Sequence, residues 1–302
     1  MSPRLKYLFL PIIAGVAMTW AYWPTLAEMA ERWTEDPQYS HGFLVPLFSG
    51  FLLWYKRAEI QDKQLSPSWW GIAFLGAGLG LWILGTHFFF NWIAEISILF
   101  CLAGLAVVVG GWTALRWSWQ PILFLGFMVP LPYRIQTMLG GKLQSIATAM
   151  STYAIQTLGA PAIREGNVIL INDVKVGVVD ACNGLGMLMT FFAISTAFVM
   201  ILRSSELWVR AIVVVSAVPV AILANVARIT VTGLLFNASQ EHLANVVFHD
   251  VAGLLMMPLA IVILFLELRL LRRVLVERPD SAKGKSISFD SRGVMTPAPV
   301  TR

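Results

Sequence analysis

The sequence predicts an all-α membrane protein, a polytopic bundle of about eight transmembrane helices. Of its 302 residues, 57% are hydrophobic and only 13% are charged, about half the charged fraction of a typical soluble domain. The hydrophobic residues fall into continuous blocks, and about 20 apolar residues make a helix that crosses the hydrocarbon core. Continuous blocks indicate helices, which satisfy their own backbone groups in lipid.

Eight such blocks can be placed along the chain. The first is expected to be a retained span rather than a signal peptide, since no small-residue cleavage site interrupts it. Prolines interrupt the second and fifth blocks, so either could be short or broken. The predicted spans are residues 7–27, 41–55, 69–88, 92–115, 119–135, 184–202, 208–236 and 247–271.

Two segments between the fifth and sixth spans are not apolar enough to cross. Residues 136–160 read as a short amphipathic helix lying at the outer membrane face. Residues 164–180 contain two β-branched runs around Asn172-Asp173, which predicts a β-hairpin. Residues 1–276 then form one transmembrane domain, and 277–302, rich in Ser, Pro, Gly and charge, form a disordered tail.

The distribution of basic residues predicts the orientation. With the N-terminus inside, sixteen of the 22 Lys and Arg residues lie on the cytoplasmic side, as the positive-inside rule requires. Both termini are therefore predicted to be cytoplasmic. The net charge of +5 comes from clusters that flank apolar blocks, so it does not indicate a nucleic-acid partner.

Three unusual residues converge at one depth in this topology. Cys182 lies just before the span 184–202, and His249 opens the span 247–271, so both are at the outer side. Arg228 follows the inner Arg210 by 18 residues, or about 27 Å of helix, which brings it close to the outer end. We expect the chemistry of the protein to be located at this outer face.

The three residue types form a plausible catalytic set. A thiolate is a strong nucleophile whose pKa falls beside a cation, histidine exchanges protons near neutral pH, and arginine stabilises an anion. Thiol, base and donor together are typical of covalent acyl transfer. Asn183 and Gly184 surround the thiol with polar and small groups, while Asn225 continues a polar stripe on the helix of Arg228. No metal-ligand cluster is evident, and thiol chemistry needs no cofactor.

Each residue also has a structural interpretation. Cys101, inside an apolar block, is assigned to packing, and Arg228 could snorkel to the headgroups. His41 could join the site, position a substrate or cap the span 41–55. Two other classes of function stay open, namely a polytopic transporter and a non-catalytic membrane subunit of an exopolysaccharide assembly machine.

The chain resembles the exosortase family of membrane transpeptidases over about residues 30–270. The motifs that carry the resemblance are short and lie in the family's order. They are Asp36-Pro37-Gln38-Tyr39-Ser40-His41-Gly42, Pro130-Leu131-Pro132, Cys182-Asn183-Gly184, Asn225-x-x-Arg228 and His249-x-x-x-Gly253. Asn183 departs from the family, which often has serine after the cysteine.

The resemblance implies a Cys-Arg-His active site made of Cys182, Arg228 and His249. We expect Tyr39 and His41 to bind the substrate or support this site. It implies a cysteine protease or transpeptidase of the cell inner membrane with its active site facing the periplasm. The implied substrates are membrane-anchored proteins with a C-terminal Pro-Glu-Pro motif, one transmembrane span and a basic tail, in Gram-negative bacteria that make exopolysaccharide.

Overall fold

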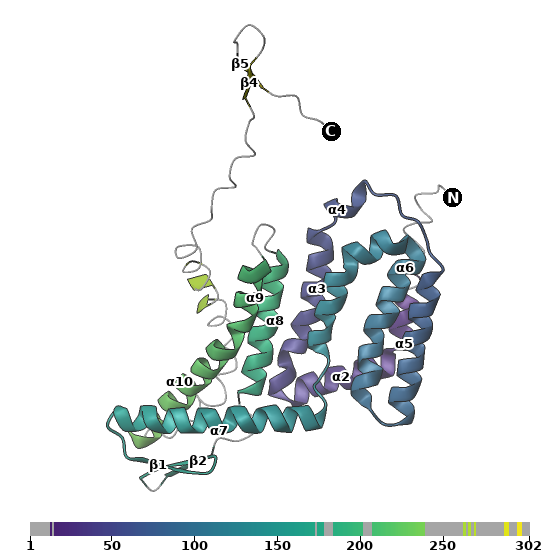
Figure 1. The fold of residues 1–302 in the computed structure, drawn as a ribbon. Helices are drawn as coiled ribbons and strands as arrows, with labels where there is room; N and C mark the ends of the chain where they lie inside the picture. The colour runs from purple at the N-terminus through teal and green to yellow at the C-terminus, as the bar shows by residue number, and fades with distance from the viewer. Residues whose placement is uncertain are drawn as a thin grey trace.

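A computed structural model describes residues 13, 15–172, 174–177, 184–201 and 207–238, together with short stretches at 262–263, 265–266, 269, 287–289 and 295–297. Within these residues the protein is a bundle of helices with a three-stranded sheet at one end (Figure 1). We call this end, which carries the helix α7 and the strands β1 to β3, the sheet end.

The helices α5 (Trp70–His87) and α6 (Asn91–Phe124) form a closely packed antiparallel pair. Three glycines of α5, namely Gly71, Gly78 and Gly85, face α6 at close range. A Cβ added at Gly71 would lie 2.6 Å from the carbonyl oxygen of Gly104, and one at Gly85 would lie 2.5 Å from the backbone nitrogen of Ala94. Small residues let two helix backbones approach in this way in membranes.

The helix α6 consists of two limbs that meet at Gly111, where φ is 70° and ψ is −163°. Glycine is required there because of the positive φ and because an added Cβ would collide with the carbonyl oxygen of Ser66. Figure 1 shows the ribbon reversing within α6. The second limb packs on α3 (Leu44–Tyr55), where the hydroxyl of Ser49 donates to the carbonyl of Pro121 at 2.9 Å. The predicted span 92–115 covers the first limb and the reversal, which comes earlier than expected. The predicted span 119–135 covers the end of the second limb, η2 and the start of α7, so it is not confirmed as one helix.

The N-terminal part of the bundle contains α2 (Trp23–Glu35), the 3-10 helix η1 (Pro37–Phe43), α3 and the single turn α4 (Ala58–Gln61). The carboxylate of Asp36 accepts from the N–H of Gln38 at 2.9 Å and so caps η1. Because η1 takes up residues 41–43, the α-helical part of the predicted span 41–55 is 12 residues long.

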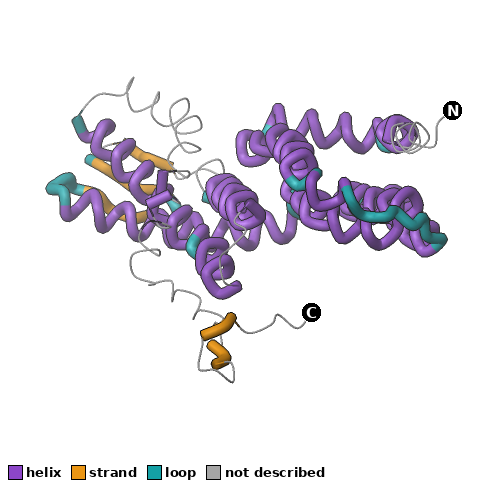
Figure 2. Tube along the Cα trace, turned by 90° about the horizontal axis from the view of Figure 1, so that it is seen from above, coloured by secondary structure: helices purple, strands orange, loops and turns teal. Residues whose placement is uncertain are grey.

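The sheet end begins after a second 3-10 turn, η2 (Leu125–Met128), and is built around α7 (Tyr133–Thr157). This helix, 25 residues long, confirms that the segment predicted at 136–160 is helical. Strands β1 (Ala162–Glu165), β2 (Val168–Ile171) and β3 (Val174–Gly177) follow as an antiparallel sheet in that order. Figure 2 shows these strands gathered at one side of the molecule, away from the N-terminal helices. The predicted hairpin is confirmed as β2 and β3, whereas β1 was not predicted.

The last described helices are α8 (Leu185–Ile201), α9 (Leu207–Val215) and α10 (Ala217–Asn237). Among the described residues, three helical stretches are long and apolar enough to cross a membrane, namely Trp70–His87, Asn91–Met128 and Leu207–Asn237. The predicted number of eight spans is therefore not confirmed. Of the predicted span 7–27 the structure describes residues 13 and 15–27, and of the predicted span 247–271 it describes only 262–263, 265–266 and 269. Within 277–302 the structure describes only β4 (Ile287–Phe289) paired with β5 (Met295–Pro297).

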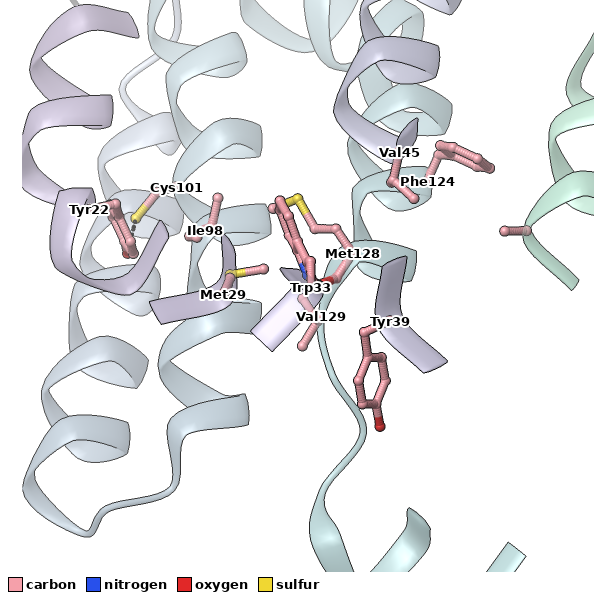
Figure 3. Packing of buried hydrophobic residues seen from close by; sticks show 11 residues of the cluster. Tyr22, Met29, Trp33, Tyr39, Val45, Ile98, Cys101, Phe124, Met128 and Val129 are labelled. Atoms are coloured by element: carbon pink, nitrogen blue, oxygen red, sulfur yellow. Dashed lines mark hydrogen bonds between the residues drawn. The ribbon is translucent and has the colours of Figure 1, made fainter. Parts of the chain in front are cut away.

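Two clusters of buried side chains stabilise the bundle, one around the N-terminal helices and one at the sheet end. One joins α2, η1, α3 and α6, and Figure 3 shows Trp33 beside Met128 and Val129 in this cluster. The indole N–H of Trp33 donates to the carbonyl of Met128 at 2.9 Å. The other cluster joins α7, the sheet and α10, and it includes Ile155, Ile169 and Ile229.

Candidate active site at the sheet end

The best-defined part of the candidate site is on α10. The guanidinium of Arg228 donates from Nη2 to Oδ1 of Asn225 at 2.9 Å, one helical turn earlier. Asn225 is 1% exposed and Arg228 is half-buried. Thr232, which follows on the same helix face, is fully buried. The polar stripe expected on this helix is thus turned into the protein, and it holds a cation in a partly dry environment.

The start of α8 is packed directly against this stripe. Gly184 has a φ of 84°, and a Cβ added there would lie 2.8 Å from Nδ2 of Asn225. Glycine therefore satisfies two requirements at once, the left-handed backbone and the close approach of the chain to the asparagine. The residue that follows the Cys182-Asn183 pair is consequently placed one side chain away from Arg228.

Of the predicted catalytic residues, only Arg228 falls in the part of the chain that the structure describes. Cys182, Asn183 and His249 lie outside the described residues. Among the supporting residues, Gly184 and Asn225 are brought together with Arg228. Cys101 is buried as predicted, but it has polar company, because its sulfur lies 3.2 Å from the hydroxyl of Tyr22.

The 3-10 helix η1, which belongs to the N-terminal part of the bundle, also contacts the start of α8. A Cβ added at Gly186, in the first turn of α8, would lie 2.9 Å from the Cα of Gln38. The two glycines at positions 184 and 186 thus touch different partners, the first Asn225 and the second Gln38. The loop that contains Tyr39 and His41 therefore belongs to the surroundings of the candidate site.

Tyr39 and His41 are both buried, at 6% and 4% exposure. Burial raises the pKa of Tyr39, and the nearby backbone of Leu131 acts in the opposite sense. Burial lowers the pKa of His41, against a smaller opposing effect of the Phe127 and Gln38 backbones. Within the described residues, neither ring nitrogen of His41 makes a hydrogen bond of normal geometry. The His41 side chain thus lies inside the protein, and α3 has no side-chain cap hydrogen bond, so the expected capping role of His41 is not observed.

Sequence reasoning missed two features that shape this region. Gly42 allows η1 to lie against the indole of Trp33, and Arg32 on α2 reaches Glu95 on α6 at 3.3 Å. Glu95 is 1% exposed, so the ion pair joins two helices inside the bundle. Nothing in the sequence pairs these residues, which are 63 positions apart.

The helix of Arg228 is fixed by the sheet and by α7. Ile229, the next residue, packs with Ile155 of α7 and Ile171 of β2. A Cβ added at Gly233 would lie 2.7 Å from Ile155 and 2.9 Å from Ile171. A guanidinium on such a rigid support can hold an oxyanion or a thiolate in a fixed position. The part of the chain that the structure describes holds no group of three His, Cys, Asp or Glu residues placed to bind a metal ion.

Comparison with protein families agrees with this arrangement. The family model of the transmembrane exosortases matches residues 33–266, which includes η1, α7, the sheet, α8 and α10. The chain therefore belongs to the transmembrane exosortase family. Comparisons with curated proteins and with solved structures returned no match.

Proposed function

We propose that the chain is a membrane-embedded cysteine protease or transpeptidase with Cys182 as nucleophile. The observation that carries the proposal is the contact between Gly184 and Asn225, the side chain that binds Arg228. Two residues of chain span at most about 7 Å, so this contact limits how far Cys182 can lie from the arginine stripe. A thiol close to a fixed guanidinium fits the requirement of a lowered thiol pKa.

In the proposed reaction the thiol of Cys182 gives its proton to His249 and the sulfur attacks a peptide carbonyl. Arg228 stabilises either the thiolate or the negative charge on the carbonyl oxygen of the tetrahedral intermediate. The C–N bond then breaks, and His249 returns the proton to the leaving amine, which leaves a thioester on Cys182. An external amine or water attacks the thioester and regenerates the thiol.

The proposed substrates are exported proteins with a C-terminal Pro-Glu-Pro motif, a single span and a basic tail. The proposed location is the inner membrane, with both termini in the cytoplasm and the sheet end facing the periplasm. The positive-inside distribution of Lys and Arg supports this orientation. In the proposed orientation, α7 and the sheet face the side on which a membrane-anchored substrate emerges. Tyr39 and His41 are proposed to position that substrate or to support the Cys182 segment.

The test is a cleavage assay in membranes that contain such a substrate and one variant of the protein. Cys182→Ala is expected to abolish the mass loss of the substrate, whereas Cys101→Ala, the matched control for loss of a thiol, is expected to retain it. Full processing by Cys182→Ala at equal expression would exclude a thioester mechanism. Cys182→Ser is expected to be inactive too, because the serine hydroxyl keeps the polarity of the site but is a much poorer nucleophile than a thiolate. Wild-type activity of Cys182→Ser would favour a transporter.

A further inference from the structure

The strand β3 presents an edge that faces away from the rest of its sheet. The sheet order is β1-β2-β3, so within the described residues β3 is paired on one side only. Lys175 is exposed, and a Cβ added at Gly177 would meet no atom within 4 Å. An open strand edge is a template that pairs with another extended chain.

The register gives the direction of the backbone groups along this edge. Two residues separate Ile171 from its partner Val174, and residues that flank a two-residue turn exchange both of their hydrogen bonds. The positive φ of Asn172, 52°, is the conformation that such turns require. Because pairs alternate along the ladder, Val176 faces β2, while Lys175 and Gly177 direct their N–H and C=O groups outward.

The pairing of β2 with β1 supports the same assignment independently. The closing pair there is Glu165 with Val168, so Val168 and Leu170 are directed to β1. This leaves Ile169 and Ile171 directed to β3, as the second ladder requires. No described residue donates to or accepts from the outward groups of Lys175 and Gly177.

The opposite edge of the sheet is less available. The outward carbonyl of Ala162 on β1 accepts from Nε2 of Gln156 at 2.7 Å, and the preceding Pro161 has no N–H to offer. The guanidinium of Arg164 is bound to Ser145 and to the carbonyl of Gly166. Among the residues that the structure describes, the β1 edge is thus partly covered by α7, and β3 has the more open edge.

The sheet is also held firmly enough to act as a template. Ile169 and Val176 are buried against α7 and α10. At the two turns, the side-chain amide of Asn167 donates to Gln144 of α7, and that of Asn172 donates to Asn237 of α10, each at 2.9 Å. A preorganised edge lowers the entropic cost of ordering a bound peptide.

We propose that the outward edge of β3 binds the substrate peptide as an added antiparallel strand, with an acidic residue of the peptide opposite Lys175. The proposal rests on the proposed function and adds how the substrate is held. β3 ends at Gly177, five residues before Cys182, a stretch of at most about 17 Å. This length limits how far the proposed nucleophile can lie from the end of a peptide bound along β3.

The Pro-Glu-Pro sequence suits such an edge for a backbone reason. Residues two apart in a strand direct their N–H groups to the same side, so both prolines lack a donor on the side away from β3. The glutamate between them keeps its N–H and C=O for Lys175, and its carboxylate faces the ammonium on the same side of the sheet. The two prolines also stop a further strand from adding to the bound peptide.

The test uses the Cys182→Ala variant in detergent and a fluorescent Pro-Glu-Pro peptide, so that binding is measured without turnover. N-methylation of the glutamate is expected to weaken binding about tenfold, which corresponds to the loss of one hydrogen bond. N-methylation three residues before the glutamate, where the N–H points away from β3, is expected to change binding less than twofold. Equal effects at both positions, or no saturable binding, would overturn the proposal.

Variants of the edge separate charge from backbone pairing. Lys175→Gln is expected to weaken binding a few-fold, whereas Lys142→Gln, which removes an exposed positive charge from α7, is expected to leave it unchanged. Equal losses in both would assign the effect to general electrostatics and overturn the role of Lys175. If binding by the Cys182→Ala variant shows the alternating sensitivity to N-methylation but the wild type cleaves no substrate, strand addition is upheld and the proposed function is refuted. If the wild type cleaves the substrate but binding shows no such alternation, the proposed function is upheld and strand addition is refuted.

Discussion

Gly184 and Gly159 have nearly the same left-handed backbone but different surroundings. Comparing substitutions at the two positions therefore tests the contact of Gly184 with Asn225. Their φ angles are 84° and 88°. A Cβ at Gly159 would meet nothing within 4 Å, whereas one at Gly184 would lie 2.8 Å from Asn225. Alanine at either position costs about 1–2 kcal/mol of backbone strain, and only Gly184→Ala also displaces the asparagine that holds Arg228.

We therefore expect Gly184→Ala to lower substrate processing at least about tenfold. Its thermal stability is expected to fall more than that of Gly159→Ala, because displacing the buried Asn225 adds overpacking to the shared backbone strain. Processing by Gly159→Ala is expected to stay within about twofold of the wild type. The measurements are the cleavage assay and the Tm of each variant in detergent. Equal processing by the two variants would show that the Gly184–Asn225 contact does not set the geometry of the site.

His41 carries a prediction about pH, because burial lowers its pKa in the folded protein. Unfolding exposes the ring and restores a pKa near 6.5. Above that pH both states hold a neutral ring, and below it the unfolded state binds a proton that the folded state excludes. The free energy of unfolding should therefore fall as the pH drops below about 6.5.

The measurement is Tm against pH, from about pH 8 to pH 5, for the wild type, His41→Gln and His87→Gln. His41→Gln is expected to have a shallower acid decline, since one source of preferential protonation is gone. His87 is exposed, so His87→Gln is expected to follow the wild type. An unchanged acid decline in His41→Gln would mean that His41 is not held neutral in the folded state.

At the scale of elements, the α5–α6 pair depends on glycines that face the partner helix. Gly85→Ala would place a Cβ 2.5 Å from the backbone of Ala94, whereas Gly80→Ala would meet nothing within 4 Å. Gly80→Ala is expected to stabilise α5 slightly through helix propensity. Gly85→Ala is expected to destabilise it by about 1–3 kcal/mol through overpacking. The measurement is the Tm of each variant in detergent, which is expected to rise for Gly80→Ala and fall for Gly85→Ala. A rise for both variants would contradict the close approach of α5 to α6 at Gly85.

Elements with a strong local signal could be predicted from the sequence. The amphipathic helix α7 and the turn at Asn172-Asp173 both have one, in their periodicity and their turn residues. The strand β1 was missed because Arg164 and Glu165 break its apolar alternation. The reversal of α6 was placed too late because Gly110-Gly111 lies inside an apolar block, where a single glycine conformation, invisible to hydropathy, turns the chain.

The candidate site could be predicted only in part, for a reason that belongs to the whole molecule. Arg228 stood out because a charge inside an apolar helix is costly, and Asn225 because it shares the helix face. The contact of Gly186 with Gln38 joins segments 148 residues apart, and no local pattern reports such a contact. The same holds for the ion pair of Arg32 with Glu95. Long-range packing, rather than the identity of the motifs, is what the structure adds.

The orientation of the molecule in the membrane gives the last prediction. The sheet and α4 lie at opposite ends of the bundle (Figure 1), so one residue at each end reports both sides. Lys175 and Lys63 are both exposed. In a cysteine-free background (Cys101→Ala with Cys182→Ala), Lys175→Cys is expected to react with a membrane-impermeant maleimide in intact spheroplasts, and Lys63→Cys only after lysis.

This outcome follows from the predicted topology, in which most Lys and Arg residues are cytoplasmic. It would put the proposed nucleophile and the β3 edge on the side where exported substrates emerge. Labelling of Lys63→Cys before lysis, with Lys175→Cys protected, would show that the topology is the inverse of the predicted one. The sheet end would then face the cytoplasm, and a sorting signal that has already crossed the membrane could not reach it. Cleavage of such a substrate by an inverted protein would require a different site, so the labelling result decides where the chemistry can occur.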